Sequence, residues 1–297
     1  MSPDPALPGA PQEPALFSSV LIPVDLSENS RSVATLLSGL PGLRRVILLH
    51  VVYNRYLHET PAAANPSVEN ARVFLETMKK DLVLPGVMVT VLVREIASEE
   101  IAECIGTAAS EEECTLIMMS RRGAGIISSI LLGSVASDLV RYGEHSLLLI
   151  PPAPPAVFSG AGLLSRVQVC TDFSMPEISN LAFDLLPAGS TADLFHVVTS
   201  GNSGQEVQDA VAAASARLDH IRDSGGKPGI TVNSCVAVGS APEEILAYAE
   251  GQGVSLILVK SRSRKGMISS LIGSTSAPVA RNAKRPVLIL KKWLPLG

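Results

Sequence analysis

The chain is poor in aromatic residues, in net charge and in long apolar runs. Of its 297 residues 4% are aromatic, a single one is Trp, and the formal net charge is −4. A small negative charge argues against a nucleic-acid-binding protein that works through bulk positive charge. No apolar run reaches the ~18 residues that a membrane-spanning helix needs. We therefore expect neither nucleic acid nor a membrane among its partners.

The four cysteines lie far apart and form no CxxC pair. No set of His, Cys and carboxylates has the spacing of a metal site, so we expect no metal site in the protein itself. Residues 1–16 are rich in Pro and lack the basic and apolar regions of a signal peptide. Scattered cysteines without an export signal are typical of buried thiols in a reducing compartment. These features predict a cytoplasmic protein with a disordered tail over residues 1–16. The cysteines are Cys104, Cys114, Cys170 and Cys235.

Two common catalytic motifs are also absent from the sequence. There is no G-x-S-x-G, which marks a nucleophile elbow, and no G-x-x-x-x-G-K-[ST], which marks a P-loop. The sequence therefore gives no support for a hydrolase with a nucleophile elbow or for a P-loop nucleotide-binding protein.

What the chain does contain is an alternation of short apolar strands and amphipathic helices that occurs twice. Equivalent pairs such as Asp25 and Asp172, or Gly133 and Gly273, are separated by a nearly constant offset of about 140 to 147 residues. We predict one domain over residues 17–151, a Pro-rich linker over 152–164 and a second domain over 165–292. The strands are expected at 17–24, 46–52, 87–93, 115–119, 146–150, 167–171, 192–198, 230–238, 254–259 and 286–290.

Alternating strands and helices predict an α/β fold with a parallel sheet and helices on both faces. Ligands of such sheets bind at the carboxyl ends of the strands, where the strand order reverses. Asp25 follows the first strand and Ser120 follows the fourth, so both are expected at that edge.

Glycines after the fourth strand form the main candidate site. Gly123 and Gly133 are separated by nine residues, and Ser134 follows. Because glycine lacks a Cβ atom, the backbone can approach a ligand closely, and Ser134 would cap the next helix and offer its N–H and hydroxyl groups to an anion. The alternative interpretation is that these glycines only turn the chain and that Gly133-Ser134 only begins a helix.

This segment resembles the nucleotide motif of the universal stress protein family. The family pattern is Gly-x-x-Gly, nine residues, then Gly-Ser or Gly-Thr, and this chain has Ser120-Arg-Arg-Gly123, nine residues, then Gly133-Ser134. The segments Leu131–Ala136 and Leu49-His50-Val51 are also similar to family members. The resemblance implies two tandem Rossmann-like (adenine nucleotide α-hydrolase-like) domains. It also implies a five-stranded parallel sheet of order 3-2-1-4-5 in each, and binding of ATP or AMP, with or without Mg, in some members.

The resemblance also implies roles for individual residues of the first domain. Asp25 and Val51 would lie on the adenine side, and Met119 and Ser120 would lie near the base and ribose. Ser120 departs from the family pattern because it adds a side chain where the family has Gly. The residues that would hold phosphates are Gly123, Gly133, Ser134 and Val135.

The second domain departs further, because its segment reads Lys260-Ser-Arg-Ser263, nine residues, Gly273-Ser274. Both leading glycines are missing, and Pro278 is expected about four residues into the next helix, where it would remove an early hydrogen bond. Basic side chains could replace the backbone donors in a second site, but a degenerate half kept for its fold is the favoured interpretation. The residues of such a second site would be Asp172, Val197, Val259, Lys260, Ser263, Gly273 and Ser274.

His50 and His196 lie in apolar strands at matching places in the two units, so we predict a structural hydrogen bond for each. Arg121 and Arg122 could either reach phosphates or lie in a solvated loop. Lys284-Arg285 and Lys291-Lys292 are most simply surface charges.

We therefore predict a stress-response or regulatory protein that binds an adenine nucleotide, mainly in its first domain, rather than an enzyme. Because single-domain family members pair through their last strand, the resemblance implies an internal pseudo-dimer with residues 146–150 near 286–290. Pairing of whole chains and an unknown protein partner are compatible with this prediction. The alternatives are a slow ATPase and a nucleotide-free scaffold.

Overall fold

The computed structural model describes most of the chain in both halves. The first half begins with a 3-10 helix, η1 (Ala15–Phe17), whose Phe17 is fully buried. Ala15 and Leu16, which the sequence placed in the tail, therefore belong to the folded part, and Leu16 packs against the core. The described residues are 15–54, 66–121, 132–152, 162–174, 177–199, 201, 203–225, 227–261 and 274–291.

A single ten-stranded sheet runs through both halves in the order β3-β2-β1-β4-β5-β10-β9-β6-β7-β8. Within each half the strands lie in the order 3-2-1-4-5, and all neighbours within a half are parallel. The α/β class is confirmed. The strands are β1 (Ser19–Pro23), β2 (Arg45–Tyr53), β3 (Met88–Ile96), β4 (Leu116–Ser120), β5 (Ser146–Ile150), β6 (Arg166–Cys170), β7 (Thr191–Val198), β8 (Thr231–Val238), β9 (Leu256–Lys260) and β10 (Val287–Leu290).

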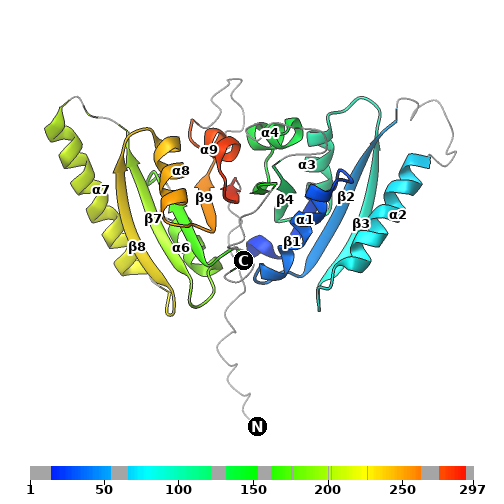
Figure 1. The fold of residues 1–297 in the computed structure, drawn as a ribbon, viewed down its shortest axis with the longest axis horizontal. Helices are drawn as coiled ribbons and strands as arrows, with labels where there is room; N and C mark the ends of the chain where they lie inside the picture. The colour runs from blue at the N-terminus through cyan, green and yellow to red at the C-terminus, as the bar shows by residue number, and fades with distance from the viewer. Residues whose placement is uncertain are drawn as a thin grey trace, which may run out of the picture.

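The two halves meet at β5 and β10, which are the only antiparallel neighbours in this sheet as described (Figure 1). Leu148 lies opposite Leu288, and both are fully buried. The expected internal pairing of the last strands is therefore present. It joins two five-stranded sheets into one continuous sheet, because the antiparallel ladder satisfies what would otherwise be two exposed sheet edges.

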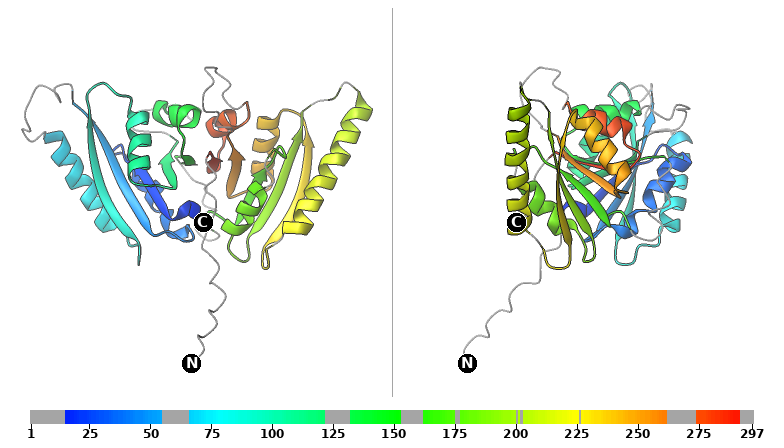
Figure 2. Two further views of the ribbon diagram at one scale, coloured as in Figure 1. Left: turned by 180° about the vertical axis from the view of Figure 1, so that it is seen from behind. Right: turned by 60° about the vertical axis from the view of Figure 1, so that its left-hand side comes forward.

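Helices lie on both faces of the sheet (Figure 2), and each face has its own apolar core. One core contains side chains from α1, α2, α6 and α7, and the other contains side chains from α3, α4, α8 and α9. Strands such as β4 and β5 are buried along their whole length because helices cover both faces. The helices are α1 (Glu28–Ala34), η2 (Leu37–Gly39), α2 (Pro66–Asp81), α3 (Ile101–Glu111), α4 (Ser134–Tyr142), α6 (Glu177–Leu185), α7 (Gly204–Gly225), α8 (Ala241–Gly251) and α9 (Ser276–Asn282).

Part of the predicted linker belongs to the core of the second half. Leu163 and Leu164 are 3% and 4% exposed and lie in the core that includes α6 and α7. The carbonyl oxygen of Leu163 accepts a hydrogen bond of 2.9 Å from the Ser255 hydroxyl. The assignment of both leucines to a linker is therefore wrong, because two adjacent apolar side chains before β6 are buried by folding.

Candidate functional site

The ends of β1 and β2 bring Asp25 and Val51 to the same edge of the sheet. The backbone N–H of Val24 donates to the Leu49 carbonyl oxygen at 2.8 Å, which continues the parallel ladder beyond Pro23. The next residue of the first strand is Asp25, which is exposed, and the matching residue of the second strand is Val51. Both therefore lie at the carboxyl ends of adjacent strands, as the sequence predicted for Asp25.

Asp25 begins a tight turn in which its carboxylate accepts several local hydrogen bonds. Its Oδ1 accepts from the Ser27 backbone N–H at 3.1 Å, from the Ser27 hydroxyl at 2.5 Å and from the Ser30 hydroxyl at 2.9 Å. Leu26, between them, has φ of 63°, a left-handed conformation that is uncommon for a residue with a branched side chain. The turn fixes the direction in which the carboxylate leaves the sheet.

The two strand histidines hold these turns in place. The His50 Nδ1 lies 2.6 Å from the Val24 carbonyl oxygen, and the His196 Nδ1 lies 2.8 Å from the Thr171 carbonyl oxygen. Because a carbonyl only accepts, Nδ1 carries the proton in both rings. The predicted structural hydrogen bond is confirmed for both histidines.

The end of β4 is linked directly to the beginning of α4. Met119 and Ser120 are the last two residues of β4, and Ser120 is 8% exposed. The backbone N–H of Arg121 donates to the Ile150 carbonyl at 2.8 Å, and its carbonyl accepts from the Gly133 N–H at 3.0 Å. This second hydrogen bond holds the start of α4 against the carboxyl end of β4.

Gly133, and not Ser134, is the N-cap of α4. Gly133 has φ of −60° and ψ of 153°, its carbonyl accepts from the Ser137 N–H at 2.8 Å, and no side chain caps the helix. Ser134 is the first helical residue, so the predicted capping role is wrong. The N–H groups of Ser134, Val135 and Ala136 have no acceptor within the helix, and the helix dipole adds partial positive charge at the same point. A helix beginning of this kind can bind an anion.

The structure thus places every described member of the predicted first site at one edge of the sheet. This edge is where the strand order reverses between β1 and β4, as expected for a ligand site in an open α/β sheet. Gly123 lies outside the described residues. The described members are Asp25, Val51, Met119, Ser120, Gly133, Ser134 and Val135.

The second half repeats the Asp turn of the first half. The Asp172 Oδ1 accepts from the Ser174 backbone N–H at 2.9 Å and from the Ser174 hydroxyl, and Phe173 has φ of 59°. Val197 lies near the end of β7, and Val259 and Lys260 end β9, so these residues share one edge. Ser263 and Gly273 lie outside the described residues.

Helix α9 begins later than the repeat predicts. Its N-cap is Thr275 and its first residue is Ser276, so Ser274 lies before the helix, unlike Ser134 in α4. Pro278 is the third helical residue, where its missing N–H would have no intrahelical acceptor in any case. The expectation that Pro278 removes a helical hydrogen bond is therefore wrong. The later start places the proline where the helix tolerates it, and leaves one donor fewer at this helix beginning than at α4.

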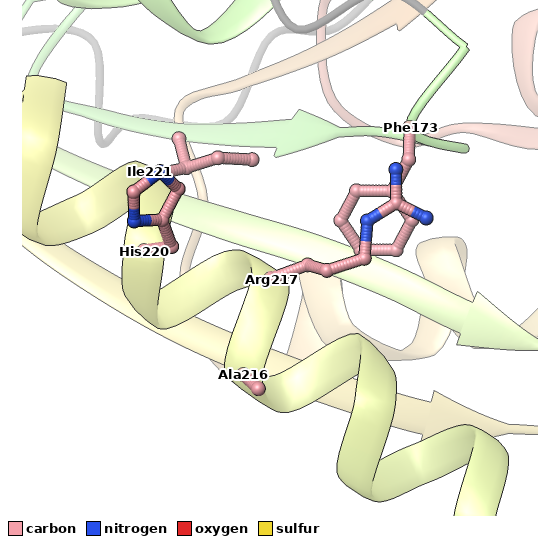
Figure 3. Close-up of a pocket in the computed structure, with 5 residues that line it drawn as sticks. All are labelled: Phe173, Ala216, Arg217, His220 and Ile221. Carbon is pink, nitrogen blue, oxygen red and sulfur yellow. The ribbon is translucent and has the colours of Figure 1, made fainter.

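A pocket of about 370 Å³ lies beside α7 in the second half (Figure 3). The Arg217 guanidinium carbon lies 4.2 Å from the Phe173 ring centroid, and that ring lies 4.4 Å from the His196 ring. None of the residues predicted for the second site lines this pocket as described. The lining residues are Phe173, Ala216, Arg217, His220 and Ile221.

Two cations have roles that sequence reasoning missed. The Arg121 side chain is 7% exposed and its guanidinium donates to the Ala283 carbonyl at the end of α9. Arg121 is therefore neither in a solvated loop nor directed at a phosphate. The only sequence signal is its place directly after a buried strand.

Lys291 is the second of these cations, and the assignment to surface charge is wrong for it. Its Nζ donates to the carbonyls of Leu139, Val140 and Gly143 at 2.7, 2.6 and 2.7 Å. These carbonyls end α4, so a residue of the second half caps a helix of the first. Burial lowers the pKa of Lys291 to about 8.

Within the described ranges, no group of three or more His, Cys, Asp and Glu could hold a metal ion, and no helix is long and apolar enough to cross a membrane. The four cysteines are free thiols. Burial raises the pKa of Cys114 to about 11, which makes it an unreactive thiol at neutral pH.

The fold consists of two α/β halves, and the candidate site residues of the first half lie at the carboxyl edge of its parallel strands. The model of the universal stress protein family matches residues 17–151 and 166–291. The chain therefore belongs to the universal stress protein family, as a member with two such domains in tandem.

Individual relatives agree with this assignment. A universal stress protein of Mycolicibacterium smegmatis is 24% identical over 205 residues, which cover 66% of this chain and 68% of that protein. One from Bacillus subtilis is 34% identical over 74 residues, a quarter (25%) of this chain and 50% of that protein. A universal stress protein structure from Archaeoglobus fulgidus has a TM-score of 0.67 and 23% identity over 92% of this chain and 96% of that one, which shows a shared fold.

Proposed function

We propose that this stress-response protein binds an adenine nucleotide, ATP or AMP, in its first half and acts as a regulatory binding protein. The second half is degenerate as a nucleotide site and serves the fold. The observation that carries the proposal is the hydrogen bond from the Gly133 N–H to the Arg121 carbonyl. It holds the beginning of α4, whose first N–H groups have no acceptor within the helix, at the carboxyl end of β4.

The predicted roles fit this arrangement of residues. Phosphates would lie at Gly133, Ser134 and Val135, where N–H groups and the helix dipole favour negative charge. The base and ribose would lie toward Asp25 and Val51 and beside Met119 and Ser120. A Mg²⁺ ion, if present, would come with the phosphates of the nucleotide, as is usual for this cation.

A direct test is to identify what the purified protein carries and binds. Mass spectrometry of the ligand released by denaturation should find an adenine nucleotide, and calorimetry should measure binding of ATP or AMP. Gly133→Val should lower the affinity about 100-fold or more, because its side chain would occupy the position of a phosphate next to the helix. The matched Gly273→Val in the second half should change the affinity less than about twofold.

The remaining outcomes separate the rival functions. Absence of a released nucleotide together with no measurable binding of ATP or AMP would reject the proposal in favour of a nucleotide-free scaffold. Phosphate release that disappears in Gly133→Val would identify a slow ATPase at this site. Because Gly133 is buried, thermal unfolding must show that the variant is folded, and Ser134→Ala offers a milder change at the same place.

A further inference from the structure

We propose that Arg121 is a positioning residue of the first-half site, and that through it the second half sets the affinity of the first half for its nucleotide. This inference rests on the proposed function, because it assigns a regulator to the same site. Arg121 is connected to two predicted site residues. It follows Ser120 in the chain, and its carbonyl oxygen accepts a hydrogen bond from the Gly133 N–H.

The backbone of Arg121 joins three elements of the first half. Its N–H donates to Ile150 at the end of β5, and its carbonyl accepts from Gly133 at the beginning of α4. A displacement of Arg121 would therefore move the N-terminus of α4 relative to β4. Since the phosphate donors are the first N–H groups of α4, their direction depends on where Arg121 lies.

The side chain of Arg121 leaves the first half altogether. It is 7% exposed, and its guanidinium donates to the carbonyl oxygen of Ala283, the C-cap residue of α9. The carbonyl end of a helix carries partial negative charge, so a cation is favoured there. One residue thus bonds to the beginning of α4 through its backbone and to the end of α9 through its side chain.

The other end of α4 is also held by the second half. The Lys291 amine donates to three carbonyls at the end of α4, and α4 and α9 lie side by side where the halves meet (Figure 1). Helix α4 is therefore held through Arg121 at its beginning and through Lys291 at its end. The position of the phosphate donors is set by contacts with the second half and not only by the first.

Such a link works in both directions. If the position of α9 affects nucleotide binding, then bound nucleotide must stabilise the position of α9 by the same coupling free energy. Binding in the first half should therefore slow amide hydrogen exchange in α9, although none of the predicted first-site residues belongs to that helix.

The experiment compares Arg121→Gln with Arg141→Gln in the full chain, using ATP and AMP as probes. Arg141 is exposed in the last turn of α4, so its variant removes the same charge without the buried contact. Calorimetry below the unfolding temperature should show affinity lowered about tenfold or more in Arg121→Gln and changed less than about twofold in Arg141→Gln. Bound nucleotide should slow amide hydrogen exchange of residues 276–283 in the wild type and in Arg141→Gln. In Arg121→Gln the same residues should exchange at an unchanged rate, even when the variant is saturated with nucleotide. Exchange in α7, far from the junction (Figure 1), should not respond.

The possible results distinguish failure of the Arg121 inference from failure of the proposed nucleotide binding. If the wild type binds neither ATP nor AMP, the proposed function itself fails. If the wild type binds nucleotide but exchange in α9 does not change, the inference is wrong while the function stands, and this holds even if Arg121→Gln does not fold. Equal affinities in the wild type and folded Arg121→Gln would also overturn it.

Discussion

In the first half, α4 begins at Ser134 directly after a glycine N-cap, whereas in the second half α9 begins at Ser276 after Thr275. Helix α4 offers three backbone N–H groups without an intrahelical acceptor, and α9 offers two because its third residue is Pro278. The two halves share strand order and the Asp turn, so these features cannot distinguish the proposed ligand site of the first half from the second half. The difference lies in the helix that would receive the phosphates.

The halves also differ inside the core that faces α3 and α4 in one half and α8 and α9 in the other. Leu21 and Ile47 in the first half correspond to Gln168 and Asp193 in the second, and all four are 0–1% exposed. Asp193 accepts from Arg166 Nε at 2.6 Å and from Asn233 Nδ2 at 2.8 Å. Neither the amide nitrogen Nε2 nor the amide oxygen Oε1 of Gln168 has a hydrogen-bond partner in the described part of the chain.

The two halves carry their polar groups in different places. The first half has apolar Leu21 and Ile47 in this core layer, and its free hydrogen-bond donors within α4 are the first backbone N–H groups of that helix, at the edge of the sheet. The second half buries an ion pair and an amide in its core, where an unsatisfied amide costs free energy. The second half is thus the less optimised of the two in packing, and under the proposed function also in binding.

The largest effect is expected on the free energy of unfolding when the residues at this core position, Leu21 and Gln168, are each replaced by the residue of the other half. Leu21→Gln should lower the free energy of unfolding by about 3–5 kcal/mol, since it removes a packed apolar side chain and buries an amide. Gln168→Leu should raise it by about 1–3 kcal/mol, because the unsatisfied amide is removed. Chemical denaturation followed by circular dichroism measures both. A loss of stability in Gln168→Leu would show that the amide has a partner in solution, such as a buried water.

A smaller effect is expected from removing the Asp of each turn. Asp25→Ala should weaken ATP or AMP binding roughly 10- to 100-fold, the value of a hydrogen bond to a charged group. Asp172→Ala should change it less than about twofold, because the second half is proposed to lack a site. Titration calorimetry of both variants makes the comparison, and Asp25→Asn serves as a control that keeps an acceptor for the Ser27 N–H. Equal losses in Asp25→Ala and Asp172→Ala would mean that both halves bind nucleotide.

Much of this molecule was predictable from the sequence, for identifiable reasons. Apolar runs such as 146–150 mark strands buried on both faces, and the constant offset between His50 and His196 marks the repeat. Asp25 could be placed at a strand end because it directly follows an apolar run. Local patterns of this kind were sufficient to predict the α/β class and the sheet edge at which the candidate site residues lie.

The parts that could not be predicted depend on contacts between distant segments. Arg121 and Ala283 are 162 residues apart in the chain, and Lys291 reaches carbonyls about 150 residues before it. A charged residue after a strand looks the same in sequence whether water or a helix end receives it. The later start of α9 was also hidden, because Gly273-Ser274 repeats the sequence of Gly133-Ser134, whereas Ser274 lies before its helix and Ser134 lies in the first turn of α4.

The smallest effect is expected on the pH dependence of the free energy of unfolding. It comes from Lys291, whose contact with the end of α4 cannot be repeated by the equivalent residue of the first half. Lys291 follows β10, and the equivalent residue after β5 is Pro151, which cannot donate a hydrogen bond. Burial lowers the pKa of Lys291 from 10.5 to about 8. Between these two values the unfolded chain holds a proton that the native protein has released, so the free energy of unfolding rises with pH there. The slope from this one residue is at most about 1.4 kcal/mol per pH unit.

Substitution by methionine isolates that slope from all other titrating groups. The difference in free energy of unfolding between the wild type and Lys291→Met should grow in favour of the wild type from about pH 8 to 10.5, and should be constant below that range. Lys284→Met is the matched control, because Lys284 is exposed and pairs with Glu250 at 3.0 Å on the surface. Parallel pH profiles for the wild type and Lys291→Met would show that Lys291 keeps an ordinary pKa. In that case its three carbonyl partners would offset the cost of burial, and the second half would hold α4 with a charged amine throughout the physiological range.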